Sequence, residues 1–272
     1  MPELPEVETI RRELLPLLIG RRIAGIELYW ENTLRGISAA DFNELFAGLL
    51  INGLERRGKY LIFKLEGGKC FSIHFRMTGS IISGTDEGGL PRYCRAVIRL
   101  DGGLNLFFTD PRKFGCIEVP DVCASFLTRL GPEPLGESFT PEVLAKILTN
   151  RKAAVKAVLL DQRSIAGIGN MYADEALFKA GIYPLRPGGS ISQDEVGALH
   201  SAIRSVLTKA IDRKGATVSD YTRPGGEPGS AQDDFCVAHR RGCSCPCCGN
   251  PVERTVVCQR GTYFCPVCQP RV

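Results

Sequence analysis

Eight of the twelve cysteines lie between residues 236 and 268, and four of them have the spacing of a metal site. Cys245 and Cys248 form one C-x-x-C pair, and Cys265 and Cys268 form a second pair after a gap of 16 residues. Two such turns can direct four thiolates at one ion, which is the tetrahedral arrangement that structural Zn²⁺ prefers. Four protein ligands leave no open coordination position, so we predict one structural Zn²⁺.

Two other uses of these thiols stay open, because a redox pair and iron–sulfur ligation draw on the same residue type. Cys247 could replace Cys245 or Cys248 as a ligand, although only the chosen pair has the two-residue gap. A tail of about 30 residues cannot bury enough apolar surface to fold alone, so we expect the metal to take the place of a core.

Composition and charge restrict the class of protein. The 272 residues are 44% hydrophobic and 24% charged, which is typical of a globular chain. Residues 1–141 carry 17 basic and 18 acidic side chains, whereas residues 142–272 carry 17 and 12, so the net charge of +4 is concentrated in the second half. This asymmetry favours a polyanionic partner.

The expected location follows from what the sequence lacks. No apolar stretch reaches the 18 or so residues of a spanning helix, and the opening MPELPEVE has no apolar segment of a signal peptide. We therefore expect a reducing compartment and no association with a membrane.

Four motifs occur in one order along the chain: MPELPEVE, TDPRKFG at 109–115, GIGNMYADE at 167–175, and the double C-x-x-C. With these motifs the chain resembles the bacterial formamidopyrimidine-DNA glycosylase (Fpg/endonuclease VIII) family over essentially its whole length. The resemblance implies a bifunctional DNA glycosylase and AP lyase of base excision repair. It also implies a monomer in the bacterial cytoplasm that is associated with the nucleoid through DNA. Such an enzyme removes oxidised purines (8-oxoguanine and formamidopyrimidines) from double-stranded DNA and cleaves the strand at abasic sites by β,δ-elimination.

By this resemblance, Pro2 is the nucleophile and Glu3 the general acid/base, with Glu6 in a supporting role. A free α-amine titrates near ~8, so a neutral fraction exists at pH 7 once Met1 is removed. The amine can attack C1′ and form an iminium that acidifies the C2′ proton. Without the family pattern, Pro and Glu in a first helical turn are more often structural.

The resemblance also assigns catalytic roles to Lys59 and Arg260. Lys59 matches a lysine that reaches the phosphate or lesion at the active site, and a lysine suits that role as a mobile point charge. Arg260, between the two C-x-x-C pairs, matches the zinc-finger arginine that clamps a phosphate at the lesion.

A second set of residues is expected to bind DNA. Extruding a nucleotide leaves a gap in the stack, and Met77, Arg112 and Phe114 match the residues that fill it. The pattern of residues alone favours core packing for Met77 and Phe114. The remaining expected phosphate contacts are His74, Lys156 and Asn170.

Two alternative functions stay open. An endonuclease VIII-like enzyme for oxidised pyrimidines would use the same scaffold, although ELPE and the Arg112–Phe114 pair favour purines. A non-catalytic, zinc-dependent damaged-DNA-binding protein becomes attractive if Met1 is retained. The sequence also departs from the family where Ala238-His239-Arg240 replaces Tyr-Gly-Arg, so the tyrosine's phosphate contact is missing unless His239 substitutes.

These residues need elements to position them. Apolar residues at helical spacing predict a helix over 4–18 that stops at Gly20. Short β-rich segments follow at 22–30, 60–65, 70–75, 96–100 and 104–108. Helical periodicity then covers 142–160, 172–180 and 192–213, after a helix start at Thr140-Pro141.

These elements predict an α+β multidomain chain, and the resemblance implies the identity of its domains. Residues 1–131 are expected to form an N-terminal helix and an antiparallel β-sandwich, with a linker over 132–141. Residues 142–235 are expected to form a helix–two-turn–helix domain that carries a Gly-rich lesion loop at 222–232. Residues 236–272 are expected to form a zinc-finger β-hairpin.

Overall fold

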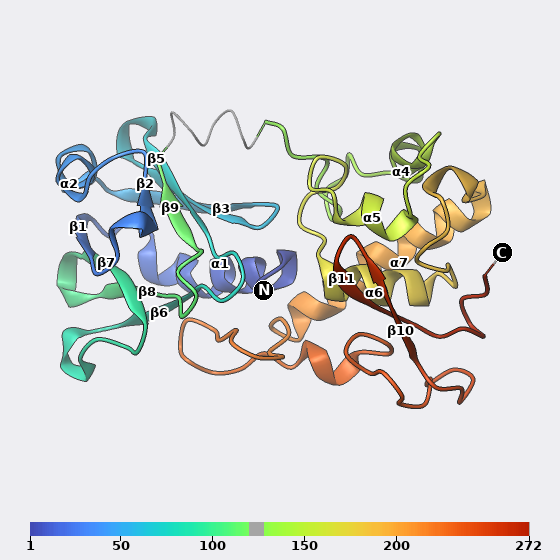
Figure 1. The fold of residues 1–272 in the computed structure, drawn as a ribbon. Helices are drawn as coiled ribbons and strands as arrows, with labels where there is room; N and C mark the ends of the chain where they lie inside the picture. Colours follow the sequence, from blue (N-terminus) through green and yellow to red (C-terminus); the bar gives the residue numbers. More distant parts are fainter. Residues whose placement is uncertain (120–127, 272) are drawn as a thin grey trace. The chain divides into compact units, whose positions relative to one another are not determined.

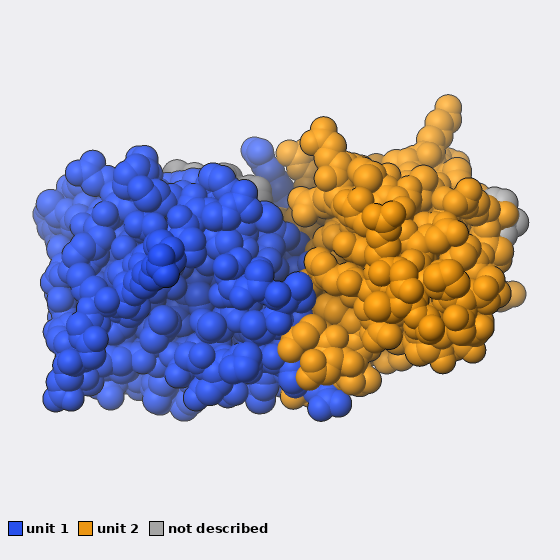
Figure 2. Space-filling model, turned by 60° about the horizontal axis from the view of Figure 1, so that its bottom comes forward, with its two compact units in different colours: residues 1–129, 213–230 blue, residues 130–212, 231–272 orange. Residues whose placement is uncertain are grey.

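A computed structural model of the chain describes residues 1–119 and 128–271, and it divides into two compact units (Figure 2). Unit 1 contains residues 1–129 and 213–230, and unit 2 contains residues 130–212 and 231–272. Among the described residues, no helix combines the length and apolar character that crossing a bilayer requires. The predicted α+β architecture, with a β-sandwich, a helical domain and a C-terminal hairpin, is confirmed.

Unit 1 is built on two sheets whose strands pair antiparallel, apart from one short parallel pair between β2 and β9 (Figure 1). One sheet has the order β1-β7-β8-β6, with strands Ile23–Leu28, Cys94–Leu100, Asn105–Thr109 and Ser80–Gly84. The other has the order β2-β9-β5-β4-β3, with strands Leu34–Arg35, Cys116–Glu118, Cys70–His74, Tyr60–Leu65 and Ile51–Arg57. The sequence pattern indicates five of these nine strands.

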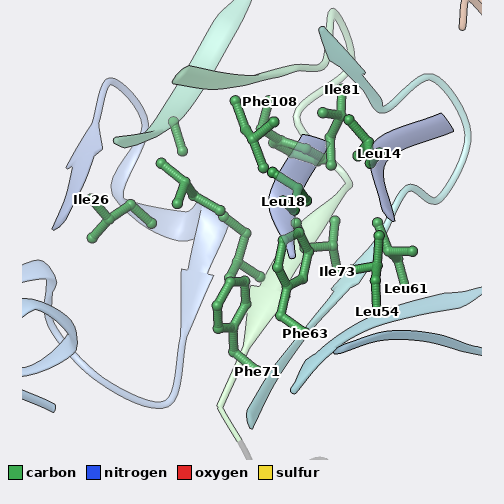
Figure 3. Close-up of a cluster of buried hydrophobic side chains, with 14 of the residues drawn as sticks. Leu14, Leu18, Ile26, Leu54, Leu61, Phe63, Phe71, Ile73, Ile81 and Phe108 are labelled. Carbon is green, nitrogen blue, oxygen red and sulfur yellow. The ribbon is translucent and has the colours of Figure 1, made fainter. Parts of the chain in front are cut away.

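Helix α1 (Leu4–Leu18) supplies an apolar face to the core of unit 1. Its side chains at three- and four-residue spacing, such as Leu14 and Leu18, are fully buried with residues of both sheets (Figure 3). Gly20 follows with φ of 82°, which agrees with the predicted stop. A second helix, α2 (Ala39–Phe46), escaped prediction although Ser38 and Asp41 form a capping box at its start.

Residues 213–230 return to unit 1 after the helices of unit 2. The Ser83 N–H donates to the Pro224 carbonyl at 2.9 Å, and the Arg223 guanidinium pairs with Glu13 at 2.7 Å. These contacts explain why the structure groups 213–230 with the sandwich, although we predicted them within the helical domain. The expected lesion loop at 222–232 is therefore anchored at Arg223 and Pro224.

Unit 2 contains four helices among its described residues. They are α4 (Pro141–Leu148), α5 (Val155–Leu160), α6 (Asn170–Lys179) and α7 (Gln193–Asp212). The predicted N-cap at Thr140 is confirmed, since its hydroxyl accepts from the Val143 N–H. The periodic stretch 142–160 is two helices instead of one, because Asn150 adopts a left-handed φ of 59° after α4.

A two-stranded hairpin completes unit 2. Strands β10 (Glu253–Val257) and β11 (Arg260–Phe264) pair antiparallel, with Val257 opposite Arg260. The two residues between them, Cys258 and Gln259, have φ of 49° and 60°, as a tight type I′ turn requires. The turn places Arg260 at the first position of β11.

Candidate active site and nucleic-acid interface

The N-terminal motif forms a buried carboxylate cluster. Glu3 is the residue before α1, and its exposed fraction is 1%, while that of Glu6 is 0%. The Glu6 carboxylate accepts from the Glu3 N–H at 2.8 Å through one oxygen and from the Ala216 N–H at 2.8 Å through the other. Pro2 is also buried. Glu6 thus fixes the backbone next to Pro2 and ties it to the return segment.

Gly215 is required by this arrangement. Its φ is 78°, and a Cβ placed on it would lie 3.0 Å from Oε1 of Glu6 and 3.0 Å from the Tyr221 ring. A side chain here would therefore displace the carboxylate that holds the N-terminus.

Lys59 lies in the tight turn between β3 and β4 and is 7% exposed. Arg56 supports this turn by donating to the Gly58 carbonyl at 3.1 Å and pairing with Glu8 at 3.2 Å. Although burial raises the pKa of Glu8, its hydrogen bonds and ion pairs with Arg11, Arg12 and Arg56 lower it to about 2. Glu8 is consequently a permanent anion that anchors the arginine behind Lys59.

His74 ends β5, opposite Tyr60 of β4. Burial, with the positive charges of Arg76, Lys59 and Arg35, lowers the pKa of His74 to about 3, so the ring is neutral. Its Nδ1 accepts from the Arg76 N–H at 2.9 Å. The proton of the neutral ring is therefore on Nε2, which can donate to a phosphate oxygen.

Met77 and Phe114 do not belong to the core. Their exposed fractions are 39% and 48%, so the core packing that the residue pattern favours is wrong for both. The Arg112 guanidinium lies over the Phe114 ring at 4.9 Å. Met77 and Phe114 thus present exposed apolar side chains, and Arg112 presents a planar hydrogen-bond donor next to Phe114.

Asp110 holds these residues in place, and sequence analysis missed it. Its buried carboxylate accepts from the backbone N–H groups of Arg112 at 3.1 Å, Phe114 at 2.7 Å and Gly115 at 2.7 Å. It also accepts from the Thr78 hydroxyl, next to Met77. An aspartate followed by a short Pro- and Gly-containing loop is the pattern of side chain-to-backbone capping that could have indicated it.

In unit 2, Lys156 and Asn170 converge on the hairpin. The Lys156 ammonium is fully buried, pairs with Asp174 at 2.7 Å and donates to the Thr262 hydroxyl at 2.8 Å. The Asn170 amide donates to the Gly261 carbonyl at 2.9 Å. This burial supports a role for Lys156 in positioning the strand that begins at Arg260, and its expected contact with DNA stays a prediction.

Glu175 is a second carboxylate that sequence analysis missed. It accepts from the N–H groups of Cys236, Val237 and Ala238 at 2.8–3.0 Å. Burial raises its pKa, and these three donors oppose that rise. The next residue, His239, has a left-handed φ of 62°, a conformation that favours glycine.

The four predicted metal ligands lie together. The sulfur atoms of Cys245, Cys248, Cys265 and Cys268 are all within 4.8 Å of one another. The Cys248–Cys265 and Cys245–Cys268 distances are 3.4 and 3.8 Å. A tetrahedron with Zn–S bonds of about 2.3 Å has S–S edges of about 3.8 Å, so the thiols fit Zn²⁺. Among the described residues, this is the only such cluster of three or more candidate ligands.

Comparison with known proteins agrees with this geometry. Residues 1–117 match the formamidopyrimidine-DNA glycosylase N-terminal domain, and residues 130–222 match the formamidopyrimidine-DNA glycosylase H2TH domain. The formamidopyrimidine-DNA glycosylase of Chloroflexus aggregans is 45% identical over 99% of this chain and 98% of its own length. That of Symbiobacterium thermophilum is 44% identical over 99% and 90%.

Solved structures show the same likeness. MutM (Fpg) from Thermus thermophilus is 42% identical and superimposes with a TM-score of 0.90 over 100% of both chains. A Lactococcus lactis Fpg complex with abasic-site DNA is 33% identical, with a TM-score of 0.92 over 99% of this chain and 100% of that one. Fold and site together define a DNA glycosylase of base excision repair. The chain belongs to the formamidopyrimidine-DNA glycosylase family, whose members also act as AP lyases.

Proposed function

We propose that this enzyme removes oxidised purines from duplex DNA through an iminium at Pro2 and then cleaves the strand by β,δ-elimination. The observation that carries the proposal is the buried Glu3–Glu6 arrangement at the N-terminus, where the Glu6 carboxylate accepts from the Glu3 N–H directly after the buried Pro2. Lactococcus lactis Fpg has been solved with DNA containing Fapy-dG and with DNA containing an abasic site. We assign the same classes of lesion to this chain.

The chemistry begins once Met1 has been removed. The secondary amine of Pro2 attacks C1′, the C1′–N bond breaks, and the oxidised base leaves with a proton. Glu3 is assigned the acid/base role beside this centre. The C1′–O4′ bond then breaks as O4′ takes a proton, which opens the sugar ring and leaves an iminium between C1′ and the Pro2 nitrogen. This iminium acidifies the C2′ proton, whose loss expels the 3′ phosphate with the C3′–O bond, and a second elimination expels the 5′ phosphate with the C5′–O bond. Glu6 keeps the amine in place through the Glu3 backbone.

DNA is held on both units in this proposal. In unit 1, the neutral His74 donates to a phosphate, Lys59 supplies positive charge, and Met77, Arg112 and Phe114 fill the space left by the extruded nucleotide. The return segment 213–230, which includes most of the 222–232 loop, covers the extruded base.

In unit 2, Arg260 and the Asn170 region bind the backbone of the lesion strand. The four cysteines would hold one Zn²⁺, which supplies structure and not chemistry because all its positions are filled. Lys156, Asp174 and Asn170 then align the hairpin on the helices.

A trapping experiment tests the nucleophile. The enzyme is incubated with 8-oxoguanine duplex and reduced with borohydride, which converts an iminium into a stable adduct. We expect an adduct with the unaltered enzyme and with Pro270→Gly, an exposed control, but none with Pro2→Gly. An adduct of undiminished yield in Pro2→Gly would refute the assignment. Preferential trapping on oxidised pyrimidines would support the endonuclease VIII-like alternative instead.

A further inference from the structure

Unit 2 contains a cavity of about 350 Å³ that the proposed repair chemistry does not use. Helices α6 and α7 contribute Phe178 and Val206 to its wall, and the segment before the hairpin contributes Cys236. Cys247, from the turn that carries the first C-x-x-C pair, completes it. Two of the cysteines that lie outside the four-sulfur cluster therefore face one cavity.

The two thiols differ in their surroundings. Cys236 is half-buried and packs against the apolar cluster that includes Cys245 and Cys265. Cys247 is exposed, so a dissolved oxidant can reach it directly. The Glu175 carboxylate holds the backbone of Cys236 by accepting from its N–H at 2.9 and 3.0 Å. Both are free thiols in the structure.

We propose that Cys236 and Cys247 are a redox-active dithiol that reacts with hydroperoxides. The Cys247 sulfur attacks a peroxide oxygen, the O–O bond breaks, and a sulfenic acid and one water form. The Cys236 sulfur then attacks the sulfenic sulfur, the S–S bond forms, and a second water leaves. Overall, two thiols and one H₂O₂ give one disulfide and two waters. The sulfurs lose two electrons and the peroxide gains them.

This reaction closes part of the cavity. A disulfide requires Cβ atoms about 4 Å apart, so it draws the turn at Cys247 towards the segment at Cys236. That segment is held by the Glu175 carboxylate, which makes it the fixed partner. The other partner is the side chain of Cys247, which is exposed in the turn 246–248.

Formation of this disulfide should protect the four neighbouring cysteines that are predicted to bind Zn²⁺. Cys247 lies between Cys245 and Cys248 in sequence and is exposed, as Cys248 is, so it competes with that ligand for peroxide that reaches this turn. Reversible disulfide formation at Cys247 then competes with irreversible oxidation of the ligands. This consequence rests on the proposed Zn²⁺, whereas formation of the disulfide does not.

The test uses the full-length enzyme, reduced and then exposed to H₂O₂. Peptide mass spectrometry is expected to find Cys236 joined to Cys247 with a loss of about 2 Da, which dithiothreitol reverses. Cys243→Ser is the matched control, because Cys243 is an exposed cysteine of the same segment that does not line the cavity. It should form the same disulfide, whereas Cys236→Ser and Cys247→Ser should not.

Zinc content, measured before oxidation, separates the two parts of the proposal. If zinc is present, its release by peroxide should be several-fold faster in Cys247→Ser than in Cys243→Ser. Equal release would overturn the protective role. Absence of zinc in the reduced enzyme would overturn the proposed metal but leave the disulfide testable. Cys247 found paired with Cys243, Cys258 or a cluster cysteine, or found only as sulfinic acid, would overturn the dithiol itself.

Discussion

Replacing Asp110 with asparagine tests whether one buried carboxylate organises the surface that enters the DNA. Asp110 accepts four hydrogen bonds, three of them from backbone N–H groups of residues 112–115. Asparagine has the same shape but only one acceptor oxygen. Of the two orientations of the asparagine amide, the better one keeps the oxygen towards the N–H groups of Phe114 and Gly115. It turns the NH₂ group towards the Arg112 N–H.

The magnitude follows from these contacts. One charge-assisted bond, of about 1.5–3 kcal/mol, is lost, and the other three weaken by about 1 kcal/mol each as the charge disappears, which gives a total of about 4.5–6 kcal/mol. Because the lost hydrogen bonds hold a single surface loop, we expect part of this free energy to appear as a smaller fraction of molecules whose loop has the conformation that binds DNA. Affinity then falls by about 10- to 100-fold.

The assay is fluorescence anisotropy with a duplex that contains an abasic-site analogue, and urea denaturation confirms that each variant is folded. Asp101→Asn is the matched control, because Asp101 is an exposed aspartate of the same unit. Thr78→Val removes a single donor and should cost about 1 kcal/mol. Wild-type affinity in folded Asp110→Asn would refute the reasoning.

Three further predictions follow from buried groups. The pKa of His74 is lower in the folded than in the unfolded state, so the unfolding free energy should fall as pH drops from about 6.5 towards 3. Between pH 7 and 4.5, the unfolding free energy of His74→Gln should fall by about 3 kcal/mol less than that of the unaltered enzyme, as measured by urea denaturation. Lys156→Met should lower the unfolding free energy by about 3–5 kcal/mol, because it leaves Asp174 buried without its ion pair. Adding Asp174→Asn should restore part of the lost unfolding free energy, and no restoration would contradict the pairing. Cys265→Ser should abolish zinc binding in elemental analysis and weaken DNA binding about 10- to 100-fold, the scale of one or two lost charged contacts, whereas Cys243→Ser should do neither.

The sequence could predict what depends on local pattern. The limits of α1 follow from its apolar spacing and Gly20, and the start of α4 follows from Thr140-Pro141. The sulfur cluster follows from the two-residue gaps between cysteines, because a C-x-x-C turn is a local structure.

What depends on distant partners could not be predicted. Met77 and Phe114 are as apolar as any core residue, and only the loop held by Asp110 leaves them exposed. The burial of Lys156 likewise depends on distant partners, because Asp174 and Thr262 cover its ammonium group. The break after α4 rests on a left-handed Asn150, a conformation that helical periodicity does not reveal.

The hydrogen bond from the Ala216 N–H to Glu6 has a consequence for biosynthesis. It joins residues 210 positions apart, so the surroundings of the proposed nucleophile are completed by a segment translated long after it. At about 5–20 residues per second, the ribosome reaches Ala216 roughly 10–40 s after Pro2. Throughout that interval Met1 can be removed from the nascent chain while the Glu6 carboxylate still lacks its hydrogen bond from the Ala216 N–H. Processing can therefore precede assembly, and prematurely terminated chains should be unable to attack DNA.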